Sequence, residues 1–179
     1  MSDQPDKPFL QIVVCAAGVA TDVGKLITAV QERHWDVSVV ATPQGLSFLD
    51  AEAVEAQTGH PIRSAWRTPD QPRPTRPADA IAVAPATFNT VNKWAAGISD
   101  NLALGILCEA PAMGVPIAVL PYLNSAQAAH PAYRQSLERL REMGVLIGSY
   151  EPHRPKAGGG ADRYRWEEVL DLLEPRLAR

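Results

Sequence analysis

Cysteine, aromatic residues and long apolar runs are all scarce in this chain. Cys15 and Cys108 are its two cysteines among 179 residues. Each lies in an apolar segment, which is typical of reduced core thiols and argues against a disulfide framework or a metal site. No segment approaches the roughly 20 apolar residues that cross a bilayer, and the N-terminal MSDQPDKPF has no apolar run of the signal-peptide kind. We expect a cytoplasmic protein that does not bind membranes.

A strong charge of either sign is also missing. The net charge is -3, so electrostatics provide no reason to expect a nucleic acid or an anionic membrane as partner. The dinucleotide fingerprint GxGxxG does not follow the first apolar segment, and the phosphate loop GxxxxGK[ST] does not match either. Small molecules and proteins are therefore the expected partners.

Apolar segments of strand length alternate with helical patterns along the chain. Strands are expected at residues 9–18, 35–42, 61–66, 80–84, 115–121 and 145–150. Helices are expected within residues 24–34 and 43–60, and at residues 88–97, 101–113, 131–143 and 166–177. Continuously apolar strands separated by helices predict a mostly parallel six-stranded sheet covered on both faces. The fold class is α/β: one Rossmann-like or flavodoxin-like three-layer domain over residues 1–179, with a flexible N-terminus at 1–8.

Two segments have the composition of loops. Residues 68–77, TPDQPRPTRP, hold four prolines and no apolar side chain apart from them, which predicts an exposed irregular loop. Residues 151–165 contain three consecutive glycines. This Gly-rich loop is either a slack connection or a lid that moves over a site.

Hydroxyl and amide side chains follow three of the expected strands. In doubly wound sheets ligands bind at the carboxyl ends of the strands, where CAAGVATD, ATPQGLSF and APATFNT stand here. Thr87 and Asn89 also have an ordinary structural role open to them as helix N-caps. The convergence of Thr42, Thr87 and Thr90 with the aromatic Phe48 favours a pocket for an aromatic cofactor with one phosphate.

The segment PATFNTVNKWAAGISDNLA, residues 85–103, resembles the PASANT motif of the homo-oligomeric flavin-containing cysteine decarboxylases. In that family the motif is followed by a lysine, a glycine and an Asp-Asn-Leu triplet, and Lys93, Gly97 and residues 100–102 stand in the matching places. LPYLNSAQAAHPA is similar to the second motif, P-x-M-N-x-x-M-W, with Asn124 at the asparagine. The order of strands and motifs agrees over nearly the whole chain.

The resemblance implies bound FMN at a subunit interface of a trimer or a multiple of trimers, and the residues themselves show no constellation of metal ligands. The residues that it places at the flavin are Ala86, Thr87, Phe88, Asn89 and Thr90, with Ala17, Gly18 and Val19 after the first strand and Thr42 and Phe48 after the second. The family has Gly-Ser where this chain has Ala16-Ala17, so one hydroxyl donor to the phosphate is lost.

The resemblance also implies an enzyme, a lyase that decarboxylates a cysteine after the flavin has oxidised it. In such an enzyme the cofactor supplies the electron chemistry while protein groups orient the substrate. Asn89 and Asn124 are the residues expected to hold the substrate carboxylate, as uncharged amide donors.

Two departures from the family pattern bear on the reaction. The family histidine lies eight residues before an aspartate matched by Asp79, which gives Gln71 here. The four histidines of the chain are instead expected to be solvated or capping residues: His34, His60, His130 and His153. The Gly-rich loop lacks the reactive cysteine of phosphopantothenoylcysteine decarboxylases.

These departures favour the C-terminal cysteine of a peptide over phosphopantothenoylcysteine as the substrate. Two alternatives stay open. One is an FMN-binding protein of the same fold without decarboxylase activity, in another redox or regulatory role. The other is a plain α/β nucleotide-binding module, against which the missing glycine fingerprint counts.

Overall fold

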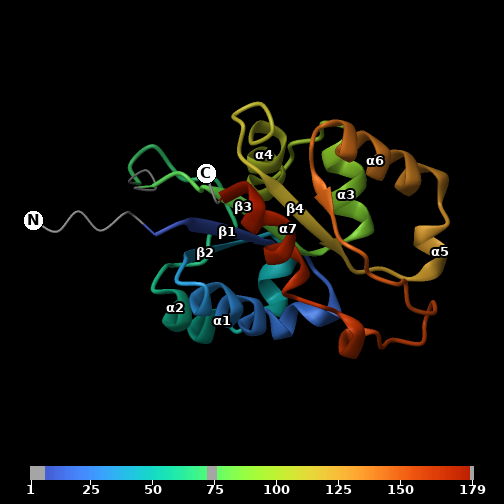
Figure 1. The fold of residues 1–179 in the computed structure, drawn as a ribbon, viewed down its shortest axis with the longest axis horizontal. Coiled ribbons are helices and arrows are strands. Elements are labelled where there is room, and N and C mark those ends of the chain that lie inside the picture. Colours follow the sequence, from blue (N-terminus) through green and yellow to red (C-terminus); the bar gives the residue numbers. More distant parts are fainter. Residues whose placement is uncertain (1–6, 72–75, 178–179) are drawn as a thin grey trace, which may run out of the picture.

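Five parallel strands form the sheet in this computed structural model, which describes residues 7–71 and 76–177 (Figure 1). The strand order is β2-β1-β3-β4-β5, a flavodoxin-like doubly wound order, which confirms the predicted α/β class. Leu10 of β1 pairs with Val37 of β2 and with Ala80 of β3, and Ile81 pairs with Ile117 of β4. The bounds are β1 (Phe9–Val14), β2 (Asp36–Ala41), β3 (Ala80–Ala86), β4 (Ile117–Pro121) and β5 (Leu146–Ile147).

Helices cover both faces of the sheet (Figure 1). Leu10, Ile12 and Val14 of β1 pack toward α1 and α7, whereas Val13, between the last two, packs toward α3, α4 and α6. This alternation follows from the two-residue period of a strand, and both faces are apolar because both are covered. The helices are α1 (Gly24–Glu32), α2 (Ala51–Thr58), α3 (Phe88–Ala95), α4 (Leu102–Glu109), α5 (Ser125–Ala128), α6 (Pro131–Glu142) and α7 (Glu168–Leu177).

The prediction of six strands is wrong, because residues 61–66 form one isolated bridge and no strand. Arg63 pairs with Val40: its N–H donates to Val39 O at 3.1 Å and its carbonyl accepts from Ala41 N at 2.8 Å. Pro61 has no amide proton to extend this pairing. Trp66 lies against Gly105 of α4, whose missing Cβ would stand 2.1 Å from the indole ring.

The predicted loops and termini fall partly outside the described residues. Residues 72–75 of the proline-rich segment and residues 1–6 of the N-terminus are outside them. Within the segment, Gln71 N donates to Thr68 O at 3.0 Å, so this end forms a turn. None of the helices in the described ranges has both the length and the apolar character of a membrane-spanning helix.

Candidate functional site

A cavity of about 450 Å³ lies at the carboxyl ends of the strands. The segments that follow β1, β2, β3 and β4 all line it, and it includes the point between β1 and β3 where the strand order reverses. Open α/β sheets bind their ligands at this place. Seven of the residues predicted from the sequence line the cavity: Ala17, Thr42, Thr87, Phe88, Asn89, Thr90 and Asn124.

Four predicted cofactor residues do not line this cavity. Gly18 is exposed at the start of a 3₁₀ turn (Gly18–Asp22), and the side chains of Val19 and Ala86 are buried in the core. Phe48 is exposed at the end of a second 3₁₀ turn (Gly45–Phe48). For these four a contact with the flavin stays a prediction.

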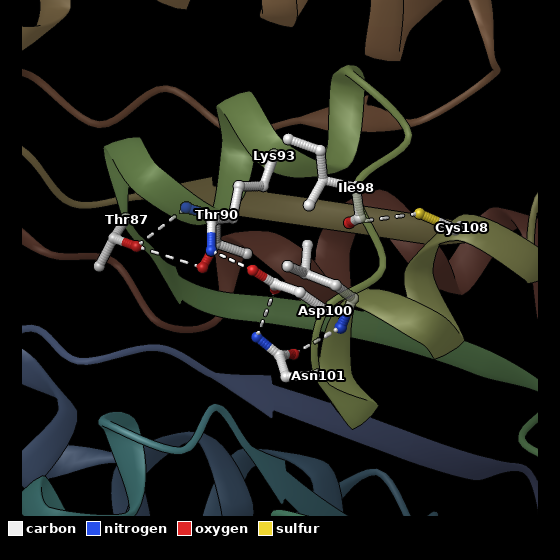
Figure 2. Close-up of polar contacts among 8 residues, drawn as sticks. Thr87, Thr90, Lys93, Ile98, Asp100, Asn101 and Cys108 are labelled. Atoms are coloured by element: carbon white, nitrogen blue, oxygen red, sulfur yellow. Dashed lines mark hydrogen bonds and ion pairs between the residues drawn. The ribbon is translucent and has the colours of Figure 1, made fainter.

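Two threonines of the cavity, Thr87 and Thr42, also accept hydrogen bonds from the backbone of the segments that follow them, and Thr87 is the N-cap of α3. Thr87 Oγ1 accepts a hydrogen bond of 3.3 Å from Thr90 N at the start of α3 (Figure 2), and Thr42 Oγ1 accepts one of 3.0 Å from Gly45 N. Among the described residues, Thr42 and Thr90 are the two buried polar side chains, 5% and 4% exposed. Capping and lining are therefore compatible roles, since a hydroxyl group both donates and accepts.

Two asparagine amides also line the cavity. Asn124 caps α5, where its Oδ1 accepts a 3.0 Å hydrogen bond from Gln127 N. This bond fixes the side chain and leaves the Nδ2 protons of Asn124 to donate elsewhere. Asn89 is exposed in the first turn of α3. Both amides can therefore donate to a ligand without bearing a charge.

A network of polar contacts explains the lysine and the Asp-Asn pair that follow the first motif. Lys93 of α3 pairs with Asp100, and Asn101 Oδ1 accepts from Leu104 N at 2.9 Å to cap α4 (Figure 2). Gly97, between these partners, has a φ of 74°, which favours glycine and turns the chain back from α3 to α4. Because Asp100 neutralises Lys93, this lysine adds little net charge to the cavity.

His153 also lines the cavity, contrary to the expectation that it is solvated or a cap. It is half-buried, and its Nδ1 lies 2.9 Å from the Tyr150 hydroxyl. The expectation holds for the other histidines: His34 and His60 are exposed, and His130 Nδ1 caps α6 by accepting from Ala132 N at 3.1 Å. No local pattern indicated His153, because an isolated bridge to Asn124 brings it to the site.

The cavity is also lined by Lys93 and Asn101 and by five residues that were not predicted as site residues: Ala16, Gln44, Tyr122, Leu123 and Gln127. Gln44 lies close to Thr42 in the sequence, and Tyr122, Leu123 and Gln127 lie close to Asn124, so the predicted residues could have indicated these four. Burial raises the pKa of Tyr150 to about 12, so its phenol stays protonated at neutral pH.

Cys15 lies near Thr87 and Thr90. Burial raises the pKa of its thiol, and hydrogen bonds with Thr90 and Thr87 oppose that shift in part. The thiol is fully buried, so it is neither a nucleophile nor a metal ligand here. Within residues 7–71 and 76–177 no group of three or more His, Cys, Asp or Glu side chains could hold a metal ion.

The chain matches the model of the Flavoprotein family over residues 2–177. It belongs to this family. The bifunctional coenzyme A biosynthesis protein CoaBC of Escherichia coli (strain K12) is 29% identical over 129 residues, which are 69% of this chain and 31% of that protein. The chain thus spans less than a third of this relative.

Two further relatives are covered more fully. The phosphopantothenoylcysteine decarboxylase of Arabidopsis thaliana is 29% identical over 152 residues, 80% of this chain and 71% of that protein. The solved structure of SpaF, an FMN-dependent cysteine decarboxylase, is similar at 25% identity and a TM-score of 0.68, covering 79% of this chain and 82% of that one. The predicted family is confirmed, and both relatives are enzymes, in line with the prediction of a lyase.

Proposed function

We propose that this flavoprotein binds FMN in the cavity and catalyses the oxidative decarboxylation of a C-terminal peptidyl cysteine. The observation that carries the proposal is the meeting of Thr87, Asn89 and Thr90, after β3, with Asn124, after β4, around one cavity. The relatives whose names include decarboxylase support the same reaction class.

The residues present fit a flavin mononucleotide. The cavity is within the range of roughly 300–1,000 Å³ usual for ligand sites. Its threonine hydroxyls can bond the polar edge of an aromatic ring system, and the backbone N–H groups that open α3 favour an anionic group. When bound, FMN would supply the two-electron oxidation of the substrate.

The protein groups are left with binding and orientation. The Asn89 and Asn124 amides would hold the substrate carboxylate, which is then lost as CO2. Because the amides are neutral, they would stabilise the ground-state carboxylate less than a cation does. A peptide is favoured over phosphopantothenoylcysteine because the Gly-rich loop has Gly158, Gly159 and Gly160 where those enzymes carry a reactive cysteine.

The reaction is tested with FMN-loaded protein and short peptides ending in cysteine, with mass spectrometry to detect loss of CO2 and two hydrogens. Asn89→Asp should abolish product formation, because a second carboxylate would repel that of the substrate. Asn92→Asp is the matched control on the same helix: Asn92 Oδ1 accepts from Ser136 at 2.8 Å, which a carboxylate also does. Full activity of Asn89→Asp would contradict the assigned role.

The second candidate is an FMN-binding protein without decarboxylase activity. Gln71 favours it, because it stands at the position of the family histidine. A yellow protein that turns over neither cysteine-ended peptides nor phosphopantothenoylcysteine would support this candidate over the first.

The proposed assembly is a trimer or a multiple of trimers. The side chain of Trp66 is 56% exposed and that of Phe48 is 37% exposed. Burying large apolar side chains between subunits is favourable relative to leaving them in water, so they suit an oligomer interface. Light scattering on a gel-filtration column measures the mass directly, and a monomer of 19.3 kDa would contradict the proposal.

A further inference from the structure

We propose that His153 and Asn124 form a two-point clamp for the free carboxylate of the substrate. The substrate's identity rests on the proposed function, but the clamp is a property of this chain's own residues. His153 then determines specificity: it selects a peptide with a free C-terminus over the same peptide with a C-terminal amide.

The backbone places the two side chains together. Asn124 and His153 form an isolated parallel bridge between the end of the β4 segment and the Gly-rich loop. Ser125 N donates to His153 O at 2.8 Å, and His153 N donates to Leu123 O at 3.3 Å. Residues paired across parallel chains project to the same face, and both side chains line the cavity.

The clamp uses the tautomer of His153 in which Nδ1 is an acceptor. We assign the Tyr150 hydroxyl as the donor to Nδ1 across their 2.9 Å contact. A neutral imidazole that accepts at Nδ1 has its proton on Nε2. In the described part of the chain Nε2 has no protein hydrogen-bond partner, so its N–H is available to a ligand.

Packing keeps the imidazole in place. The ring of Tyr122 lies 4.8 Å from that of His153, centroid to centroid, and Tyr122 Oη donates to Gly159 O at 2.6 Å. A Cβ on Gly160 would stand 2.3 Å from Tyr150 Oη, so glycine is required for Tyr150 to reach His153. The donor is therefore held before any substrate binds, which lowers the entropy cost of binding.

Two neighbouring N–H donors suit a carboxylate. Asn124 Nδ2 and His153 Nε2 can each donate to one of its two oxygens, and bonds to a charged acceptor are the stronger kind. Each carboxylate oxygen accepts more than one hydrogen bond, so the Asn89 amide can donate to the same group. A terminal amide presents one acceptor oxygen and an NH2 group. That NH2 group would lie against one of the two N–H donors of the clamp, and two donors cannot form a hydrogen bond. The ammonium group of Lys93, which also lines the cavity, pairs with Asp100, and this pairing reduces its attraction for the carboxylate.

The test uses FMN-loaded protein and an unreactive ligand: a short peptide ending in serine instead of cysteine, and the same peptide as its C-terminal amide. Calorimetry gives both dissociation constants. For the wild type we expect the amide to bind at least about tenfold more weakly, the loss of one hydrogen bond to a charged group. His153→Leu should weaken carboxylate binding by about ten- to hundredfold and leave amide binding unchanged.

Three further variants make the result specific. His153→Gln keeps an N–H donor and should recover part of the loss, whereas Tyr150→Phe should give an intermediate loss because the ring is no longer oriented. His60→Leu is the matched control, since His60 is exposed and does not line this cavity, and it should bind like the wild type.

Equal binding of the two peptides by the wild type, or binding of neither, would overturn the clamp whether or not the protein decarboxylates cysteine. Unchanged preference for the carboxylate in His153→Leu would overturn the role of His153 alone. A wild type that prefers the carboxylate through His153 but releases no CO2 from cysteine peptides would support the clamp and refute the proposed reaction.

Discussion

The hydroxyl of Tyr122 donates a 2.6 Å hydrogen bond to the carbonyl of Gly159, which ties the Gly-rich loop to the end of β4 beside the cavity. The loop is therefore no slack connection in this conformation. Gly158, Gly159 and Gly160 all have φ values between 62° and 86°, a region that glycine adopts without strain. Any lid movement of this segment has to break the bond to Tyr122.

Tyr122→Phe should loosen the Gly-rich loop without unfolding the protein. Removing one hydrogen bond worth about 1 kcal/mol should speed amide hydrogen exchange in residues 156–163 about fivefold. Exchange measured by mass spectrometry on peptides from this segment checks the prediction. Tyr133→Phe, a change on the other face of the sheet, is the control. Equal exchange in both variants would mean that the bond does not hold the loop.

Gly45→Ala should destabilise the protein and the cavity wall together. An added Cβ would lie 2.6 Å from Val14 O and 2.8 Å from Thr42 Oγ1, and both neighbours are buried. Overpacking of this kind costs about 1–3 kcal/mol in the free energy of unfolding. Urea unfolding of the FMN-free protein measures it. Gly18→Ala is the control for stability, because nothing lies within 4 Å of its Cβ position. If Gly45→Ala lost no more stability than Gly18→Ala, the predicted overpacking at Gly45 would be refuted.

Alkaline pH should destabilise the fold through Tyr164 and Cys15. Burial raises the pKa of Tyr164 well above its ordinary value of 10.0, and that of Cys15 above 9.0. Above those ordinary values the unfolded chain has lost protons that the folded chain still binds. The free energy of unfolding is therefore at its full value below pH 9 and falls above it, by about 1.4 kcal/mol per pH unit for each such group.

Urea unfolding at several pH values between 8 and 11 measures this dependence. Tyr164→Phe should make the decline above about pH 10 shallower, although the variant loses the 2.7 Å bond to Leu120 O and is less stable at neutral pH. A slope above pH 10 that is the same in the variant and the wild type would show that Tyr164 does not cause it.

Most of the fold could be predicted because burial on both faces leaves a direct signature in the sequence. Residues such as Ile12 and Val13, or Ala82 and Val83, have to be apolar whichever way they point. Residues 61–66 were predicted as a strand, but they make a single pairing at Arg63, and Trp66 packs on α4 and not beside β2. That competition between elements is a tertiary effect, which no local pattern reveals.

The candidate site shows the same division. Thr42 and Thr87 were predicted because the ends of parallel strands meet at one edge of a sheet, and Asn124 because its segment resembles the second family motif. His153 was not, because a bridge between distant segments brings it to Asn124 and a contact with Tyr150 orients it. A loop of glycine and charged residues carries no periodicity from which such a contact can be read.

Reconstitution of the purified protein with FMN decides whether the cavity is a flavin site. We expect a yellow protein that binds one FMN per chain, with a flavin absorption spectrum shifted from that of free FMN. Titration should show saturable binding, and Thr90→Val should weaken it about tenfold, since Thr90 is one of the two buried hydroxyls of the cavity. A colourless preparation that leaves the spectrum of added FMN unchanged would contradict the account.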